Sequence, residues 1–147
     1  MKTIWNAGDR RHLCERLEAL PPDAKGRWGR MTAGQMVAHL VDATRMALGE
    51  LPCAGKRLPI RYPPLKQLII YWLPFPKGAP TAPELLGRAS LSWHGEVAEL
   101  VALLERLGRE PADRVWPEHP AFGRLTRRAW GVLVYRHTEH HLRQFGG

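Results

Sequence analysis

The sequence predicts an all-α protein, a four-helix bundle of the up-down-down-up type with a long proline-rich crossover between its second and third helices. Four segments repeat apolar residues at three- and four-residue steps, which is the period of one helix face. The alternating pattern of half-buried strands is nearly absent, and proline and glycine gather between the four segments. With 147 residues the chain can bury a core, and we expect a single domain spanning residues 1–147.

The first two helices have clear ends. The first is predicted over about Ala7 to Leu20, where Pro21-Pro22 stops it. The second begins after Thr32, which can cap the helix, and Gln35 completes a capping-box pattern. One face of this second helix holds the apolar residues Met36, Leu40, Ala43, Met46 and Ala47, with His39 among them, before Gly49 ends it.

The crossover, residues 51–83, holds eight of the thirteen prolines and is predicted to contain a short helix at Leu65 to Leu73. The third helix is predicted from about Pro83 to Leu107. The fourth follows Thr126 as its cap and continues to Gln144. The crossover also carries aromatic residues that we expect to cover one end of the bundle, as a lid over the core more than as a substrate gate: Tyr62, Tyr71, Trp72 and Phe75.

The net charge of +8 raises the question of nucleic-acid binding. The arginines are scattered, no run exceeds two, and aromatic residues do not interleave with them as a stacking platform requires. Nucleic-acid binding is therefore not favoured. An anionic small-molecule substrate is a simpler use of the charge.

Nothing near the N-terminus resembles an export signal, and the longest apolar run, Leu68 to Leu73, is far shorter than a membrane span. We therefore expect a cytoplasmic protein with no membrane partner. The two cysteines, Cys14 and Cys53, form no Cys-x-x-Cys pair and are expected to be reduced.

Histidines in the fourth helix are the strongest functional signal. His137 and His141 are four residues apart, so their imidazoles lie one above the other on the apolar face. This spacing favours a shared divalent metal over two separately hydrogen-bonded core histidines, because each buried ring nitrogen needs a partner. His39 is a candidate third ligand, although a lone histidine on an apolar face is more often only hydrogen-bonded. Three histidines would leave the metal an open position, as catalytic sites do.

The remaining histidines are not expected to be ligands: His12, His94, His119 and His140. The zinc-protease signature is also excluded. That signature needs glutamate directly after the first histidine, where this chain has Thr138. Glu139 lies about 200° around the helix from His137 and points away from it.

Two motifs resemble the DinB/YfiT-like superfamily. One is Met31-Thr32-Ala33-Gly34-Gln35-Met36-Val37-Ala38-His39, and the other is His137-x-x-His140-His141-x-x-Gln144. The stretch His119-Pro120-x-Phe122-Gly123-x-Leu125-Thr126-x-x-x-Trp130-Gly131 is similar to an uncharacterised branch. Many relatives carry His-His-Arg-Gly-Gln near the end, whereas this chain has His140-His141-Leu142-Arg143-Gln144, so the arginine is displaced by one position.

The resemblance implies a homodimeric four-helix bundle whose divalent metal, zinc or nickel, is held by His39, His137 and His141. It also implies an enzyme that transfers a low-molecular-weight thiol to an electrophilic small-molecule substrate, or a related metal-assisted hydrolase. A non-catalytic metal-binding module and a stress-linked interaction module are the alternatives. Neither catalytic residues nor residues that bind the thiol are identified by the sequence.

Overall fold

The computed structural model describes residues 1–77 and 92–147, and these are helical with no strand among them. An isolated bridge between His119 and Gly123 closes a turn. The all-α prediction is therefore confirmed for the described part of the chain. The long helices are α1 (Ala7–Ala19), α2 (Ala33–Ala47), α4 (Trp93–Gly108) and α5 (Arg127–Gln144).

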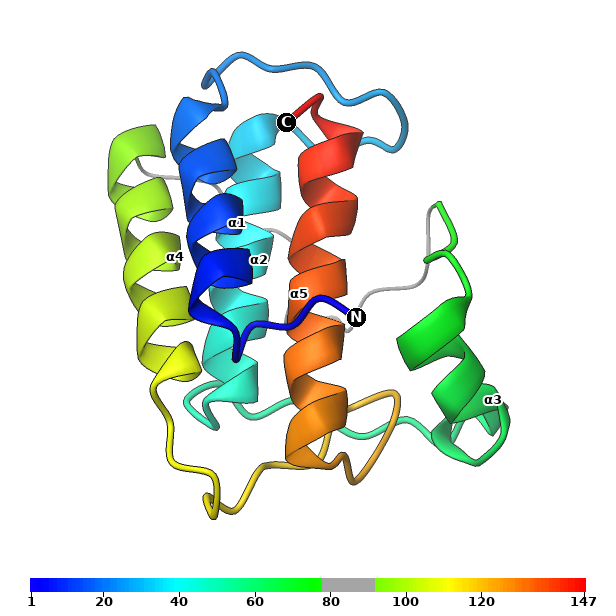
Figure 1. The fold of residues 1–147 in the computed structure, drawn as a ribbon. Coiled ribbons are helices and arrows are strands. Elements are labelled where there is room, and N and C mark those ends of the chain that lie inside the picture. The colour runs from blue at the N-terminus through cyan, green and yellow to red at the C-terminus, as the bar shows by residue number, and fades with distance from the viewer. Residues whose placement is uncertain (78–91) are drawn as a thin grey trace.

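The four long helices lie side by side with roughly aligned axes (Figure 1). In that view α1 and α5 run in one direction, and α2 and α4 run in the other. Helix α2 contacts both α4 and α5, and α1 contacts the same two helices. The face that α2 presents to α5 is the one that carries His39.

Side-chain caps define where the helices begin. Thr32 accepts from the Gln35 amide and Gln35 accepts from the Thr32 amide, so the predicted capping box is present. Thr126 caps α5 by accepting from the Ala129 amide. Ser92 caps α4, whose first residue is Trp93. The part of the predicted third helix that precedes Ser92 lies outside the described residues.

Leucines from α1 and α4 lie at the centre of the core. Leu13 and Leu17 of α1 and Leu100 and Leu104 of α4 are completely buried. Each such side chain contributes about 1.5–3 kcal/mol relative to an exposed position. Cys14 is buried among them, and burial raises the pKa of its thiol to about 11. Both cysteines are free, as the sequence predicts.

The crossover forms one short helical rod beside α5. It begins after the 3-10 turn η1 (Pro59–Arg61) and continues through α3 (Leu65–Gln67) into η2 (Leu68–Trp72), a single π-helical turn. The predicted helix at Leu65 to Leu73 is thus confirmed. Ile70 is completely buried and packs in a second core cluster with Phe122, Ala129, Val132 and Leu133.

The expected aromatic lid is only partly correct. Tyr62 and Trp72 are 61% and 73% exposed, so they cover no core. Tyr71 and Phe75 are partly buried against the second cluster. The difference arises because the crossover helix turns one side toward α5 and the opposite side toward solvent, and Trp72 lies on the latter side.

The N-terminal segment is fixed to the start of α5. The Ile4 amide donates to the Gly131 carbonyl at 3.1 Å, and the Trp5 indole donates to the Arg127 carbonyl at 2.8 Å. Gly131 is buried beneath this segment. A Cβ there would lie 2.0 Å from Nε1 of Trp5 and 2.5 Å from Oγ1 of Thr3.

We expect Gly131→Ala to destabilise the protein by about 1–3 kcal/mol, because the added methyl meets a rigid indole that is already hydrogen-bonded. Helix propensity alone predicts the opposite sign, a gain of about 0.5–1 kcal/mol. Gly95→Ala is the matched control, since its Cβ would meet only Ser92 at 3.4 Å. Urea unfolding of both variants measures the difference, and equal effects would contradict the steric argument.

Candidate metal centre

Three imidazoles converge between α2 and α5. His39 Nε2 lies 3.1 Å from His137 Nε2, and the ring centroids of His39 and His141 are 5.0 Å apart. One ring nitrogen from each of the three histidines lies within 4.8 Å of the others, an arrangement that could hold a metal ion. The structure therefore brings together the three residues that the sequence singled out.

Helix geometry explains why these side chains meet. His137 and His141 are one turn apart on α5, so their rings share a face, with centroids 4.9 Å apart. His39 comes from the middle of α2, and the capping box at Thr32 fixes where that helix starts. Since α2 packs against α5, the position of this cap along the chain determines the level at which His39 faces His137.

The cluster favours neutral imidazoles. Burial lowers the pKa of His137 well below its ordinary value, and neighbouring His141 and His39 lower it further. Burial also lowers the pKa of His141 to about 3, with a contribution from His39. Both rings are therefore uncharged at neutral pH. This is the form of histidine that binds metals.

Gln144 orients His141. Its amide nitrogen donates to the Trp28 carbonyl at 2.7 Å, so its oxygen faces Nδ1 of His141 at 2.8 Å. Because that oxygen can only accept, Nδ1 carries the proton and Nε2 keeps a free lone pair. Gly29 leaves room for this amide, since a Cβ there would lie 2.7 Å from Nε2 of Gln144.

The role of Gln144 was not assigned from the sequence, although its three-residue spacing from His141 is a signal for such a contact. The partner carbonyl of Trp28 carries no sequence signal at all. An orienting acceptor behind a histidine is the usual arrangement around metal-binding imidazoles.

Aromatic residues line the approach to the cluster. The Phe75 ring lies 6.4 Å from that of His137 and 6.0 Å from that of His140. Trp28 lies 5.5 Å from His140, and the Lys77 ammonium is 4.7 Å from the Trp28 ring. Burial lowers the pKa of His140, as does nearby Lys77. The approach therefore combines two aromatic rings with two cations, since Lys77 lies beside Trp28 and Arg136 lies beside Phe75.

Arg136 holds the C-terminal end of the crossover helix beside this approach. Its guanidinium donates to the carbonyls of Ile69 and Ile70 and to that of Leu73, at the C-terminal end of η2. The same group lies 4.9 Å from the Phe75 ring. A cation is favourable at a helix C-terminus, where carbonyls are unsatisfied. Arg136 thereby positions Phe75 beside His137.

The other histidines lie outside the cluster, as the sequence predicts. His12 and His94 are exposed. His119 closes its own turn, because Nδ1 accepts from the amides of Ala121 and Phe122 at 3.1 and 3.2 Å. Burial lowers the pKa of His119 to about 4.

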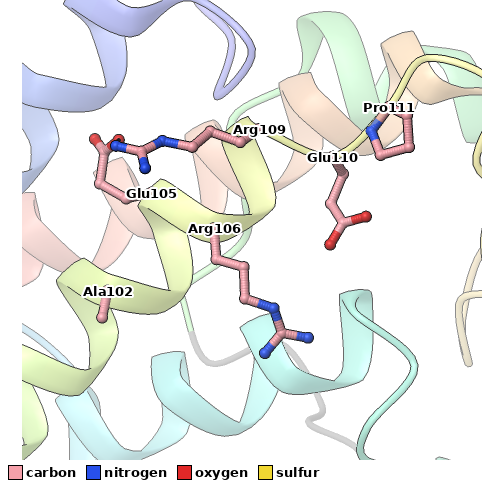
Figure 2. A pocket seen from close by; sticks show the side chains of 6 residues that line it. All are labelled: Ala102, Glu105, Arg106, Arg109, Glu110 and Pro111. Carbon is pink, nitrogen blue, oxygen red and sulfur yellow. The ribbon is translucent and has the colours of Figure 1, made fainter.

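Two open hollows in the described part of the surface lie away from the cluster. One, of about 530 Å³, lies at the C-terminal end of α4 (Figure 2), and its charged residues are largely paired with each other or with neighbours. In Figure 2 the Arg109 guanidinium reaches the Glu105 carboxylate. Another, of about 320 Å³, lies beside Trp5 and Arg127. Neither contains a histidine.

Fold and site together describe a helical protein in which three histidines from two facing helices converge. Residues 7–145 match the family model of the DinB superfamily, and the chain belongs to that superfamily. The family resemblance read from the motifs is confirmed. Comparisons with curated proteins and with solved structures give no match.

We expect the free energy of unfolding to fall as the pH is lowered from about 6.5 to about 4, in part through His119. The folded pKa of His119 lies below its ordinary value of 6.5, so the unfolded chain binds this proton more strongly. Stabilisation is complete above pH 6.5 and is lost as the pH approaches 4. The shift corresponds to at most about 3 kcal/mol.

The variant His119→Asn isolates this contribution, because its side-chain oxygen can still accept from Ala121 and Phe122 but does not titrate. We expect its stability to depend less on pH than that of the unmodified protein. Chemical unfolding at pH 7 and pH 4.5 measures the difference. Parallel pH curves for the two proteins would refute this role.

Proposed function

We propose that this protein is a metal-dependent enzyme of the DinB type, a four-helix bundle in which His39, His137 and His141 hold one divalent ion. The convergence of three imidazoles, with His39 and His141 buried and His137 half-buried, carries the proposal. Family membership supports it, as does the contact of Gln144 with His141. A single domain over residues 1–147, a homodimer and a cytoplasmic location complete the proposal.

The spacing of the donors suits a metal. Zinc binds imidazole nitrogens at about 2.0–2.1 Å, so two tetrahedral ligands lie about 3.3 Å apart. His39 Nε2 and His137 Nε2 are separated by 3.1 Å. Imidazole suits zinc and nickel alike, and three protein ligands would leave a position for an exogenous group. Without a metal, the same two nitrogens would share one hydrogen bond, which is the competing explanation that the first experiment tests.

We propose that the exogenous group is the sulfur of a low-molecular-weight thiol. A bound divalent ion would lower the pKa of that thiol, so that thiolate exists at neutral pH. Phe75 and Trp28 would limit water at the approach. In the transfer, the sulfur forms a bond to an electrophilic carbon, the bond to the leaving group breaks, and the leaving group departs with the electron pair.

The charge at the approach supports an anionic ligand. The Lys77 ammonium lies over Trp28 at its edge, and no carboxylate of the described residues is paired with it. A lysine acts on carboxylates as a point charge. The substrate class favoured here is therefore a thiol or an acceptor that carries a carboxylate.

Metal analysis of tag-free protein tests the site. We expect about one zinc or nickel ion per chain in the unmodified protein and none in His137→Ala. Gln144→Ala should retain all three imidazoles but bind the ion about 10- to 100-fold more weakly, because His141 loses its orienting acceptor. His94→Ala, at an exposed position of α4, is the matched control and should bind normally. A folded, unmodified protein that stays empty after zinc or nickel is added would refute the metal proposal.

Absorption spectroscopy tests the thiol. Nickel-loaded protein titrated with bacillithiol, mycothiol or cysteine should develop a thiolate-to-metal charge-transfer band with at least one of them. The S-methylated form of the same thiol is the control and should give no band. Metal binding without any such band would leave a non-catalytic metal-binding module, so the two halves of the proposal fail separately.

A further inference from the structure

Most of the large apolar side chains that are exposed among the described residues lie in the crossover. Six large apolar side chains between residues 58 and 73 are at least 40% exposed; we name them the apolar ridge: Leu58, Tyr62, Leu65, Leu68, Trp72 and Leu73. Elsewhere in residues 1–77 and 92–147, only Met1 and Val115 are large hydrophobic residues of similar exposure. Monomeric soluble proteins rarely leave such side chains together without a partner.

The ridge is presented in a fixed orientation. Leu65, Leu68 and Trp72 follow one another at three- and four-residue steps along the short helix, while Ile70 on the opposite side is completely buried. Arg136 ties the end of that helix to α5. Figure 1 shows α3 on the outer side of α5, away from the other long helices. The outward direction of the ridge is therefore set by packing on its inner side.

The surroundings of the ridge are cationic. Residues 51–77 contain five basic residues and no acidic one. The side chain of Arg124 is 93% exposed, and the Lys66 ammonium donates a hydrogen bond to the Arg124 carbonyl. Arg128 lies 5.5 Å from the Tyr71 ring. Among the described residues, Glu118 is the acidic side chain paired to this region, through Arg61 and Arg124.

The apolar ridge and its basic surroundings together favour a lipid surface over a second copy of the chain as the partner. A second copy of the chain, joined about a two-fold axis, would place the same cationic surface against itself. An anionic lipid surface has the opposite charge, and it accepts tryptophan, tyrosine and leucine at the boundary between headgroups and acyl chains. None of the described helices is long and apolar enough to span a bilayer, and contact from one side requires no span.

We propose that the apolar ridge docks this protein reversibly on an anionic membrane surface, with Trp72 and its neighbouring leucines among the lipid headgroups and the flanking lysines and arginines against the acidic lipids. The chain was expected from its sequence to have no membrane partner. This proposal departs from that expectation, because exposed side chains on a folded helix would make the contact, and hydropathy along the chain does not reveal them.

Sedimentation with vesicles tests the proposal. We expect binding to phosphatidylcholine vesicles that contain phosphatidylserine, weak binding to phosphatidylcholine alone, and release by salt. Trp72→Ser should weaken binding at least about tenfold, and Arg128→Gln about fivefold. Val115→Ser is the control, because it removes an even more exposed apolar side chain from outside the ridge, 92% exposed against 73% for Trp72. Thermal unfolding confirms that each variant is folded.

Three outcomes would overturn the proposal. The first is equal sedimentation with both kinds of vesicle, and the second is equal binding by Trp72→Ser and Val115→Ser. The third is a stable dimer in analytical ultracentrifugation that Trp72→Ser dissociates and that does not bind vesicles, which would assign the ridge to a second copy of the chain. A blue shift of tryptophan emission that depends on phosphatidylserine and on Trp72 would support the lipid contact directly.

Discussion

The contact between His39 and His137 joins α2 to α5, and it constrains much of the structure around it. A buried polar group without a partner costs about 1–3 kcal/mol, so each imidazole requires a donor, an acceptor or a metal. That requirement sets the position of α2 along α5 at which His39 meets His137. The caps at Thr32 and Thr126 set where α2 and α5 begin, and a shift of either helix by one residue would turn a histidine off the shared face.

The surroundings of the cluster come from segments that are remote in sequence. Side chains of α5 hold these segments by hydrogen bonds to their backbone carbonyls. Gln144 reaches the Trp28 carbonyl in the loop after α1, and Arg136 reaches three carbonyls at the end of η2. Both are side chains of α5, the helix that also carries His137 and His141. One helix therefore supplies two imidazoles, the acceptor that orients one of them, and the cation that places Phe75 beside the other.

The sequence predicted those features that local periodicity encodes. The boundaries of α1 and α2, the capping box, the short crossover helix and the convergence of His39 with His137 and His141 follow from spacing along single helices and from the family motifs. Contacts with backbone carbonyls were missed, because Trp28 and Ile69 accept through atoms that every residue has. The exposure of Tyr62 and Trp72 was also missed, because an apolar stripe shows which residues share a face but not which face packs on α5.

The crossover helix links the two proposed sites. Its inner side is held by Arg136, and the chain leaving its end carries Phe75 to the histidines. Its outer side is the apolar ridge, and between the two sides lies only one helix diameter, about 10 Å. Three hydrogen bonds to carbonyls hold this helix to Arg136, and each contributes about 1.5–3 kcal/mol, more than a neutral pair, because the guanidinium is charged. If the ridge docks as proposed, a lipid surface that displaced this helix would also move Phe75 relative to His137, because Phe75 follows the helix directly and Arg136 contacts both.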